Sequence, residues 1–329
     1  MDAISAHVLE IAQAFMRSRA ILSASELDLF TRLGRKRAAA EETARELGLD
    51  PRGTARLMDA LVALGLLEKQ AGRYGTTAQG TLLSAAHPES VLPMVLHLGR
   101  QWRLWSGLTE AVARGGSPDR QAPHFTGEDQ KNFIGAMHVA GRALAREIAA
   151  AYDTGPFRRL LDVGGGSGSY TIAFLERNPS LQGTLFDLEE VIPLADQRLR
   201  AEGLRARVEL VGGNFYEDEL PRGCDLALLS AIVHQNGPDE NVELYRKVLR
   251  ALEPGGVLLI RDFIMDESRT VPAAGTLFAL NMLVSTRRGD TYTFAEVRDT
   301  LERAGFGKVR QVRGGQLMDA LVEARAPGA

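Results

Sequence analysis

Short apolar runs and amphipathic helical patterns alternate from about residue 160 to the end of the chain. The runs before residue 265 are mainly apolar, that at 225–230 almost continuously so, and turn residues bound them, which predicts buried parallel strands. Their alternation with helices predicts an α/β fold with a doubly wound, Rossmann-like sheet. Two final runs predict an antiparallel pair at one sheet edge. The runs are 160–163, one ending at Asp187, 208–211, 225–230, 255–264, 308–314 and 318–325.

Residues 8–90 have a mainly helical pattern instead. A helix precedes the turn at 48–51, and a second helix follows, with Asp50 as its expected cap and Pro51 in its first turn. A short hairpin is predicted around Gly72. Together these features predict a winged helix-turn-helix.

Winged helices often bind DNA, so the charge of this segment matters. Residues 1–90 contain eleven Lys and Arg and eleven Asp and Glu. A module that binds a DNA groove needs an excess of positive charge to release phosphate counterions. The balance disfavours nucleic acid as a partner, although a DNA-binding regulator stays open as an alternative.

Two long helical patterns, separated by a glycine- and proline-rich break at 113–125, fill residues 88–153. We therefore predict two domains, a mainly helical one over residues 1–100 and an α/β one over 101–329. The second helical pattern and the break belong to the region of about 101–152.

The strand at 160–163 leads into a glycine-rich loop that contains Gly164, Gly166 and Gly168. A loop without side chains lets a ligand approach the backbone closely, and the following helix start favours an anionic group. The nicotinamide fingerprint requires a further glycine where this chain has Ser169. Asp187 ends the next strand, where an acid can accept hydrogen bonds from both ribose hydroxyls. A nucleoside-type ligand is therefore predicted.

The stretch LLDVGGGSGSYTIAFLERNPSLQGTLFDLEEVI at 160–192 resembles the S-adenosylmethionine site of class I methyltransferases. More narrowly, it resembles the plant caffeic-acid-type and bacterial antibiotic-type small-molecule O-methyltransferases. The segments VGGNFYEDELP, DLALLSAIVHQNGPDEN, LEPGGVLLIRDFI and FAEVRDTLERAGF match this family in order and spacing. The resemblance extends from about Val8 to the end of the chain.

The resemblance implies S-adenosylmethionine as cofactor, S-adenosylhomocysteine as its product, and no metal. It implies that Asn214, which replaces the usual Asp, contacts the adenine amino group, and that Phe215 lies against the ring. Core packing of Phe215 is the alternative. The implied cofactor-binding residues are Asp162, Gly164, Gly166, Gly168, Asp187, Leu188, Asn214, Phe215, Ser230 and Gln235.

His234 follows the strand at 225–230 and stands at the family's catalytic base position. Histidine changes charge near neutral pH, so it is suited to take the proton of a phenol as the methyl group moves. Asp262 stands where the family has a Glu that orients the histidine. A second family acid aligns with Thr291, which is no carboxylate, and neighbouring Asp290 is the alternative.

The family commonly reads His-Asp-Trp, whereas this chain reads His234-Gln235-Asn236. A donor-contacting acid is thus an amide here and an indole is absent. This departure leaves open that the reaction is changed.

The resemblance places the acceptor beside Met137, Asn281 and Met282, within a pocket to which the helical region of about 101–152 contributes. Core packing is the alternative for both methionines. Further aromatic candidates for the acceptor pocket are His97, Trp102, Trp105 and Phe125.

Composition narrows the class of protein further. The net charge is −3, no apolar run approaches eighteen residues, and Met1-Asp2-Ala3 does not open a basic region followed by an apolar stretch. We expect no membrane contact and a cytoplasmic location. The single cysteine, Cys224, excludes an intrachain disulfide, and the six histidines show no pair at metal-ligand spacing with a third ligand nearby.

The resemblance therefore implies a homodimeric S-adenosylmethionine-dependent methyltransferase whose residues 1–100 form the dimerisation domain. The expected acceptor is a hydroxyl, of phenolic type, on a small aromatic or polyketide-like secondary metabolite. Carbon or nitrogen methylation, or cofactor binding without methyl transfer, are the alternatives.

Overall fold

The computed structural model describes residues 2–116 and 127–328, which form two compact units. The first unit comprises Met1–Arg103 and Thr126–Val139, and the second comprises Leu104–Phe125 and Ala140–Ala329. The sequence-based division at residue 100 assigned all of residues 127–139 to the second domain. That stretch belongs to helix α9 (Gly127–Ala151), whose two halves fall in different units.

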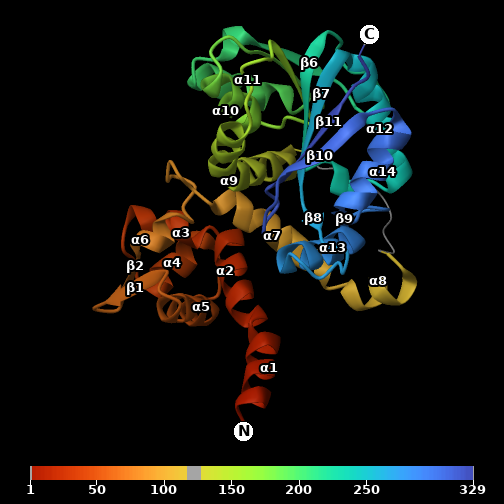
Figure 1. The fold of residues 1–329 in the computed structure, drawn as a ribbon. Helices are drawn as coiled ribbons and strands as arrows, with labels where there is room; N and C mark the ends of the chain where they lie inside the picture. Colours follow the sequence, from red (N-terminus) through yellow and green to blue (C-terminus); the bar gives the residue numbers. More distant parts are fainter. Residues whose placement is uncertain (1, 117–126, 329) are drawn as a thin grey trace. The chain divides into compact units, whose positions relative to one another are not determined.

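The first unit is built from short helices and one hairpin (Figure 1). Its elements are α1 (Ala3–Gln13), α2 (Phe15–Glu26), α3 (Leu29–Arg35), α4 (Ala40–Leu47), α5 (Pro51–Ala63), β1 (Leu67–Gln70), β2 (Arg73–Thr76), α6 (Ala78–Thr81) and most of α7 (Leu92–Trp105). Side chains such as Phe30, Met58 and Leu61 form its buried core.

Local chemistry explains the predicted helix, turn, helix and hairpin, all of which the structure confirms. Gly48 ends α4 with φ of 68°, and the Asp50 carboxylate accepts the Gly53 N–H at 2.7 Å to cap α5. Gly72, with φ of 74°, occupies the turn between the antiparallel strands β1 and β2.

The second unit contains a seven-stranded sheet with strand order β10-β11-β7-β6-β3-β4-β5. The five strands from β7 to β5 in this order pair in parallel, whereas β11 is antiparallel to both β7 and β10, which confirms the predicted edge pair. The strands are β3 (Arg159–Val163), β4 (Gln182–Asp187), β5 (Val208–Gly212), β6 (Cys224–Ser230), β7 (Leu252–Asp262), β10 (Gly307–Arg313) and β11 (Ala320–Arg325). Outside this sheet, β8 (Ile264–Met265) and β9 (Tyr292–Thr293) form a small parallel pair.

Helices cover both faces of this sheet (Figure 1). Helices α10 and α11 pack on one face together with the C-terminal half of α9, and α12 and α14 pack on the other. The helical segments of the second unit, apart from α9, are α8 (Leu108–Arg114), α10 (Ser169–Arg177), α11 (Ile192–Ala201), η1 (Arg205–Arg207), η2 (Val233–Gln235), α12 (Pro238–Ala251), α13 (Ala273–Ser285) and α14 (Phe294–Ala304).

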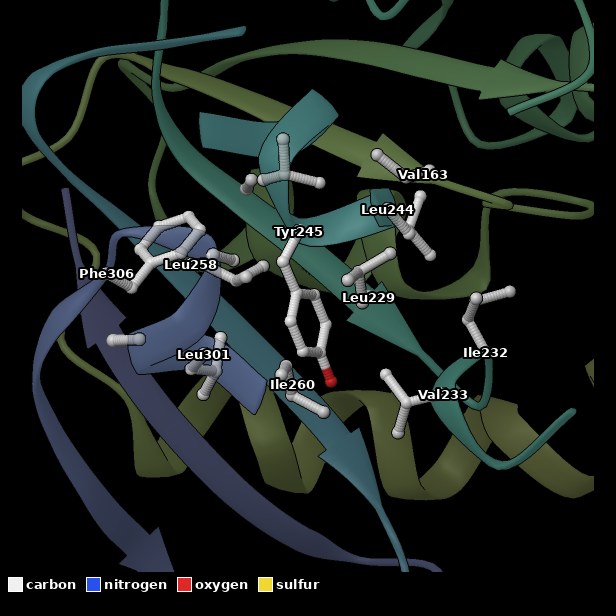
Figure 2. Packing of buried hydrophobic residues seen from close by; sticks show 14 of the residues in the cluster. Val163, Leu229, Ile232, Val233, Leu244, Tyr245, Leu258, Ile260, Leu301 and Phe306 are labelled. Carbon is white, nitrogen blue, oxygen red and sulfur yellow. The ribbon is translucent and has the colours of Figure 1, made fainter. Parts of the chain in front are cut away.

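Alternation along the strands divides the core into two layers. In β7, Leu258 and Ile260 join the cluster beneath α12 and α14, while Leu259 joins the cluster beneath α10 and α11. In the first of these layers Tyr245 of α12 inserts its ring among side chains that include Ile260 and Leu301 (Figure 2). Apolar side chains are therefore required at consecutive strand positions, which explains the continuous apolar runs in the sequence.

Replacing a core leucine in this layer is expected to destabilise the second unit. Leu301 is 0% exposed and Leu317 is 65% exposed. Leu301→Ala should lower the free energy of unfolding by about 2–5 kcal/mol, because it removes buried contacts and leaves a cavity. Leu317→Ala, the matched control, should change it by less than about 0.5 kcal/mol. Denaturant unfolding measures both, and equal losses would contradict the assigned packing.

Candidate active site

A glycine-rich loop joins β3 to α10 at the carboxyl edge of the sheet. Gly164 and Gly166 have φ of 70° and 57°, a region that residues with a Cβ rarely adopt. A Cβ on Gly164 would also lie 2.6 Å from Ile232 Cδ1. Gly168 precedes the first residue of α10. The loop is therefore close-packed against Ile232, and side chains are excluded from it by its backbone conformation.

Asp187, the last residue of the neighbouring strand β4, forms a hydrogen bond with this loop. Its Oδ2 accepts the Gly166 N–H at 2.7 Å, and its Oδ1 accepts the Leu188 N–H at 2.8 Å. Burial raises the pKa of Asp187, and these two N–H groups act in the opposite direction. The Leu188 side chain is 39% exposed beside it. Four predicted cofactor residues, Gly164, Gly166, Asp187 and Leu188, therefore meet at one sheet edge.

Asp162 is located deeper than these residues. It is 1% exposed, and its Oδ2 accepts the Thr171 hydroxyl at 2.6 Å. Burial raises the pKa of Asp162 to about 6, while the bond from Thr171 and the charge of Arg261 act against that rise. In the structure Asp162 connects β3 to α10, and direct contact with a cofactor stays a prediction.

The residues after β5 form a small aromatic site. The Asn214 side-chain oxygen accepts the Tyr216 N–H at 3.0 Å, and the Asn214 N–H donates to Asp218 Oδ2 at 2.8 Å. The rings of Phe215 and Tyr216 lie 4.6 Å apart, and Tyr216 is 53% exposed. The Asn214 side-chain oxygen, which is predicted to contact adenine, therefore already accepts one hydrogen bond from the backbone.

His234 reaches the same sheet edge from the end of β6. Ala231 turns the chain there with φ of 59°, a strained conformation for a residue with a Cβ. His234 Nδ1 lies 2.9 Å from both carboxylate oxygens of Asp262, at the end of β7. The Phe278 ring stands edge-on to the imidazole, with 4.8 Å between centroids. Because Nδ1 faces a carboxylate, it carries the proton, and Nε2 keeps a free lone pair.

The backbone around His234 is held by the segment before β9. The Asp290 N–H donates to the His234 carbonyl at 2.9 Å, and a Cβ on Gly289 would lie 2.4 Å from that same oxygen. The Asp290 carboxylate pairs instead with Arg269 at 3.6 Å and accepts the Thr291 N–H. The Asp290 carboxylate is thus engaged by Arg269 and Thr291, and its role as the second acid stays a prediction.

Asn236 joins a buried polar network two residues after His234. It is 1% exposed, donates to Asn241 Oδ1 at 3.0 Å and accepts the Tyr216 hydroxyl at 2.5 Å. Its carbonyl accepts the Tyr292 hydroxyl, and the Asn241 amide donates to the Val233 carbonyl at 2.9 Å. An amide network thus occupies the position at which the resembled family has an indole. Gln235 is half-buried.

Asn281 lies on α13, one turn after Phe278. The Trp105 indole N–H donates to its Oδ1 at 2.9 Å. An indole nitrogen only donates, so the Asn281 oxygen must face Trp105 and its NH₂ must point elsewhere. Met282 is 5% exposed and packs within the unit. Sequence reasoning named both partners of this bond without predicting the bond.

The remaining acceptor candidates lie in the first unit or outside the described residues. Met137 is half-buried on α9, His97 packs against Phe133 with 5.4 Å between ring centroids, and Trp102 packs against Phe15 at 6.3 Å. Their contact with an acceptor stays a prediction. Phe125 falls in 117–126, outside the described residues.

Sequence reasoning missed Arg261, although it identified its partner Ser230. Arg261 Nε donates to Ser230 Oγ at 2.8 Å at the same sheet edge. The available signal was that Arg261, a charged residue, directly follows the apolar run at 257–260.

In residues 2–116 and 127–328, no group of three or more His, Cys, Asp and Glu side chains could hold a metal ion. Within the same residues, no helix is both long and apolar enough to cross a membrane.

Comparisons with known proteins cover both units. Residues 118–307 match the model of the O-methyltransferase domain, and residues 9–86 match that of the O-methyltransferase dimerisation domain. The chain is 35% identical over 312 residues to a 3-hydroxy-5-methyl-1-naphthoate 3-O-methyltransferase of Streptomyces sahachiroi, covering 92% of this chain and 90% of the relative.

Two further proteins extend this likeness. The tetracenomycin polyketide synthesis 8-O-methyl transferase of Streptomyces glaucescens is 33% identical, with 92% of this chain and 91% of the relative covered. The crystal structure of human N-acetylserotonin methyltransferase in complex with SAM superposes with a TM-score of 0.86 at 25% identity, over 99% of both chains. The family models, the similar sequences and the similar structure therefore all indicate a methyltransferase.

The raised pKa of Asp162 predicts a pH-dependent stability. Because its pKa of about 6 exceeds the usual 3.8, the unfolded chain loses this proton first, and stability falls as pH rises from about 4 to 6. Asp162→Asn should remove that contribution while keeping an acceptor for Thr171. The denaturant midpoint of the variant should therefore rise relative to that of the unaltered protein up to about pH 6. Above that pH the difference between the two midpoints should stay constant. Exposed Asp299→Asn is the control, and a pH-independent difference for Asp162→Asn would refute the prediction.

Proposed function

The chain belongs to the S-adenosylmethionine-dependent O-methyltransferases, and from that membership we propose that it methylates a hydroxyl, of phenolic type, on a small aromatic or polyketide-like metabolite. In this proposal His234 is the general base and Asp262 orients it. The observation that carries the proposal is the His234–Asp262 pair at the same sheet edge as the glycine loop and Asp187.

The hydrogen-bond geometry supports the role of His234. With the Nδ1 proton held by Asp262, Nε2 is the nitrogen that accepts the hydroxyl proton of the acceptor. The Asp262 carboxylate then stabilises the imidazolium that forms. Its own Oδ1 also accepts the Phe263 N–H at 2.8 Å, which fixes the carboxylate in place. The shorter Asp thus reaches the imidazole without the extra methylene of the family glutamate.

The glycine loop and its neighbours fit the methyl donor. S-adenosylmethionine supplies a methyl group on a positively charged sulfur, which is a good leaving group. Gly164 and Gly166 carry no side chain, so the donor can approach the loop backbone closely, and in this proposal the Asp187 carboxylate accepts the ribose hydroxyls. Phe215 and Leu188 offer apolar surface for adenine. The protein then has to align the acceptor, exclude water and remove one proton.

Asn281 supports an acceptor that carries a second oxygen. Its side-chain oxygen is taken by Trp105, so its NH₂ is the group left to donate. Phe278, one turn earlier on α13, contacts the His234 ring, so Asn281 is near the proposed base. A carbonyl or hydroxyl oxygen next to the methylated position would accept this hydrogen bond. Carbon or nitrogen methylation remains the alternative.

We also propose that the protein acts as a homodimer. The match to the dimerisation domain supports this, as does the exposed apolar surface at the N-terminus. Ile4, Val8, Ile11 and Phe15 are 80%, 59%, 65% and 53% exposed. Such a surface is typical of an interface with another copy. A DNA-binding role is disfavoured by the zero net charge of residues 1–90.

Titration calorimetry with S-adenosylhomocysteine, followed by incubation with labelled donor and a panel of phenols, tests the class of function. Binding with transfer of label to a phenol is expected. Asp187→Ala should weaken binding about ten- to a hundredfold, since it removes a charged hydrogen-bond acceptor. Glu190→Ala, an exposed neighbour, is the control. Absence of binding to the unaltered protein would overturn the proposal.

His234→Ala should lower turnover by about two to four orders of magnitude, the usual contribution of general base catalysis. Affinity for S-adenosylhomocysteine should stay within about twofold. Asp262→Asn should also lower turnover, because an amide no longer stabilises the imidazolium. The control is Asp299→Asn, whose carboxylate is exposed. Steady-state rates with an identified phenol measure these effects, and unchanged turnover in His234→Ala would exclude it as base.

A further inference from the structure

An arginine is buried at the carboxyl edge of the sheet, next to the glycine loop. Arg261 is the second-last residue of β7 and is 7% exposed. The four residues before it, Val257 to Ile260, are apolar and at most 1% exposed. A guanidinium therefore stands at the end of a wholly apolar stretch, in a position that no core-packing requirement explains.

The partners of this guanidinium are neutral. Nε donates to Ser230 Oγ at 2.8 Å, and one terminal nitrogen donates to the Met318 carbonyl at 2.6 Å. The Tyr170 ring lies 5.0 Å from the guanidinium carbon. None of the ion pairs found in residues 2–116 and 127–328 includes Arg261.

Burying a charge is costly unless an opposite charge or several hydrogen bonds compensate it. A guanidinium has five N–H donors, and two are used by the neutral partners of Arg261. The charge of Arg261 lowers the pKa of Asp162, but the hydrogen bond observed at the Asp162 carboxylate comes from the Thr171 hydroxyl and not from Arg261. Arg261 therefore retains donors and positive charge for an anionic group.

A second polar group, the Tyr170 hydroxyl, lies beside Arg261. The Tyr170 hydroxyl oxygen is buried and forms no hydrogen bond of ordinary geometry among the described residues, although the nearby Ser230 hydroxyl acts to lower the pKa of Tyr170, and the residue is 8% exposed. Tyr170 is the second residue of α10, directly after the glycine loop. A buried hydroxyl without a partner is unusual and costs free energy. The Arg261 guanidinium, which keeps unused donors, lies against the ring of this tyrosine, and together they point to a ligand group that the protein itself does not supply.

The direction of the side chain indicates which ligand group is involved. Neighbouring residues of a strand point to opposite faces of the sheet, so Arg261 points away from the face on which Asp262 holds His234. It lies instead against Tyr170, on the side of the glycine loop. S-adenosylmethionine has one anionic group, the α-carboxylate of its amino-acid part.

We propose that Arg261, with Tyr170 and Ser230, binds the α-carboxylate of the methyl donor. The planar guanidinium donates two N–H groups to the carboxylate oxygens, and the Tyr170 hydroxyl donates to one of them. This inference rests on the proposed function, because it requires that the donor site is the one formed by the glycine loop.

The test compares ligands that differ only at the amino-acid end. Calorimetry measures the affinity of S-adenosylhomocysteine and of 5′-methylthioadenosine, which lacks the amino-acid carboxylate, for the unaltered protein and for Arg261→Met. The variant should bind S-adenosylhomocysteine about ten- to a hundredfold more weakly, as expected for lost charged hydrogen bonds. Its affinity for 5′-methylthioadenosine should change by less than about twofold. Arg261→Lys keeps the charge and should lose less affinity than Arg261→Met.

Arg207→Met is the matched control. The Arg207 guanidinium donates only to the carbonyls of Leu175, Asn178 and Leu181 in the hydrogen bonds observed. Its loss should affect stability and should not discriminate between the two ligands.

Each outcome distinguishes the hypotheses. Equal losses for both ligands in Arg261→Met mean a structural role and overturn the proposal, as does no loss for either. If neither ligand binds the unaltered protein, the proposed function fails instead. Should Arg261→Met not fold, the methyl ester of S-adenosylhomocysteine tests the same contact in the unaltered protein. An ester that binds as tightly as the free acid would overturn the assignment.

Discussion

The alternation of side chains at the end of β7 is the constraint on which this site depends. Asp262 and Arg261 are adjacent in sequence, so they must face opposite sides of the sheet. Asp262 meets His234 on one side, and Arg261 meets Ser230 and Tyr170 on the other. One strand end thereby separates a histidine–carboxylate pair from a guanidinium group. A shift of register by one residue would exchange the two faces and remove both.

Parallel strands bring these groups together because their carboxyl ends share one edge. The glycine loop follows β3, Asp187 ends β4, His234 follows β6 and Asp262 ends β7. The order β7-β6-β3-β4 makes these four ends neighbours. The two apolar layers, one on each face of the sheet, hold the strands in place, so the packing around Tyr245 (Figure 2) is a precondition for the geometry at the edge.

Polar groups at this edge are mostly compensated within the protein. The Asp162 carboxylate accepts the Thr171 hydroxyl, Asp187 accepts the Gly166 N–H, and Asn236 joins a network with its neighbours. Such bonds offset the cost of burial and restrict movement of the loops. The turn at Ala231, with φ of 59°, is tolerated because the surrounding bonds hold it, including the Ala231 N–H to the Arg261 carbonyl at 2.8 Å.

The sequence by itself determined the parallel strands, the glycine loop and the helix caps, because these depend on local patterns. Asp50 caps α5 as its position before Pro51 predicts, and Gly164 and Gly166 lie in the loop that the sequence predicts after the strand at 160–163. Long-range bonds depend on which side chains the fold brings together. The pairing of Trp105 with Asn281 and the turning of Asp290 toward Arg269 join residues from separate elements. Only the tertiary structure decided these contacts, because side-chain direction at a strand or helix end is set by packing and not by local spacing.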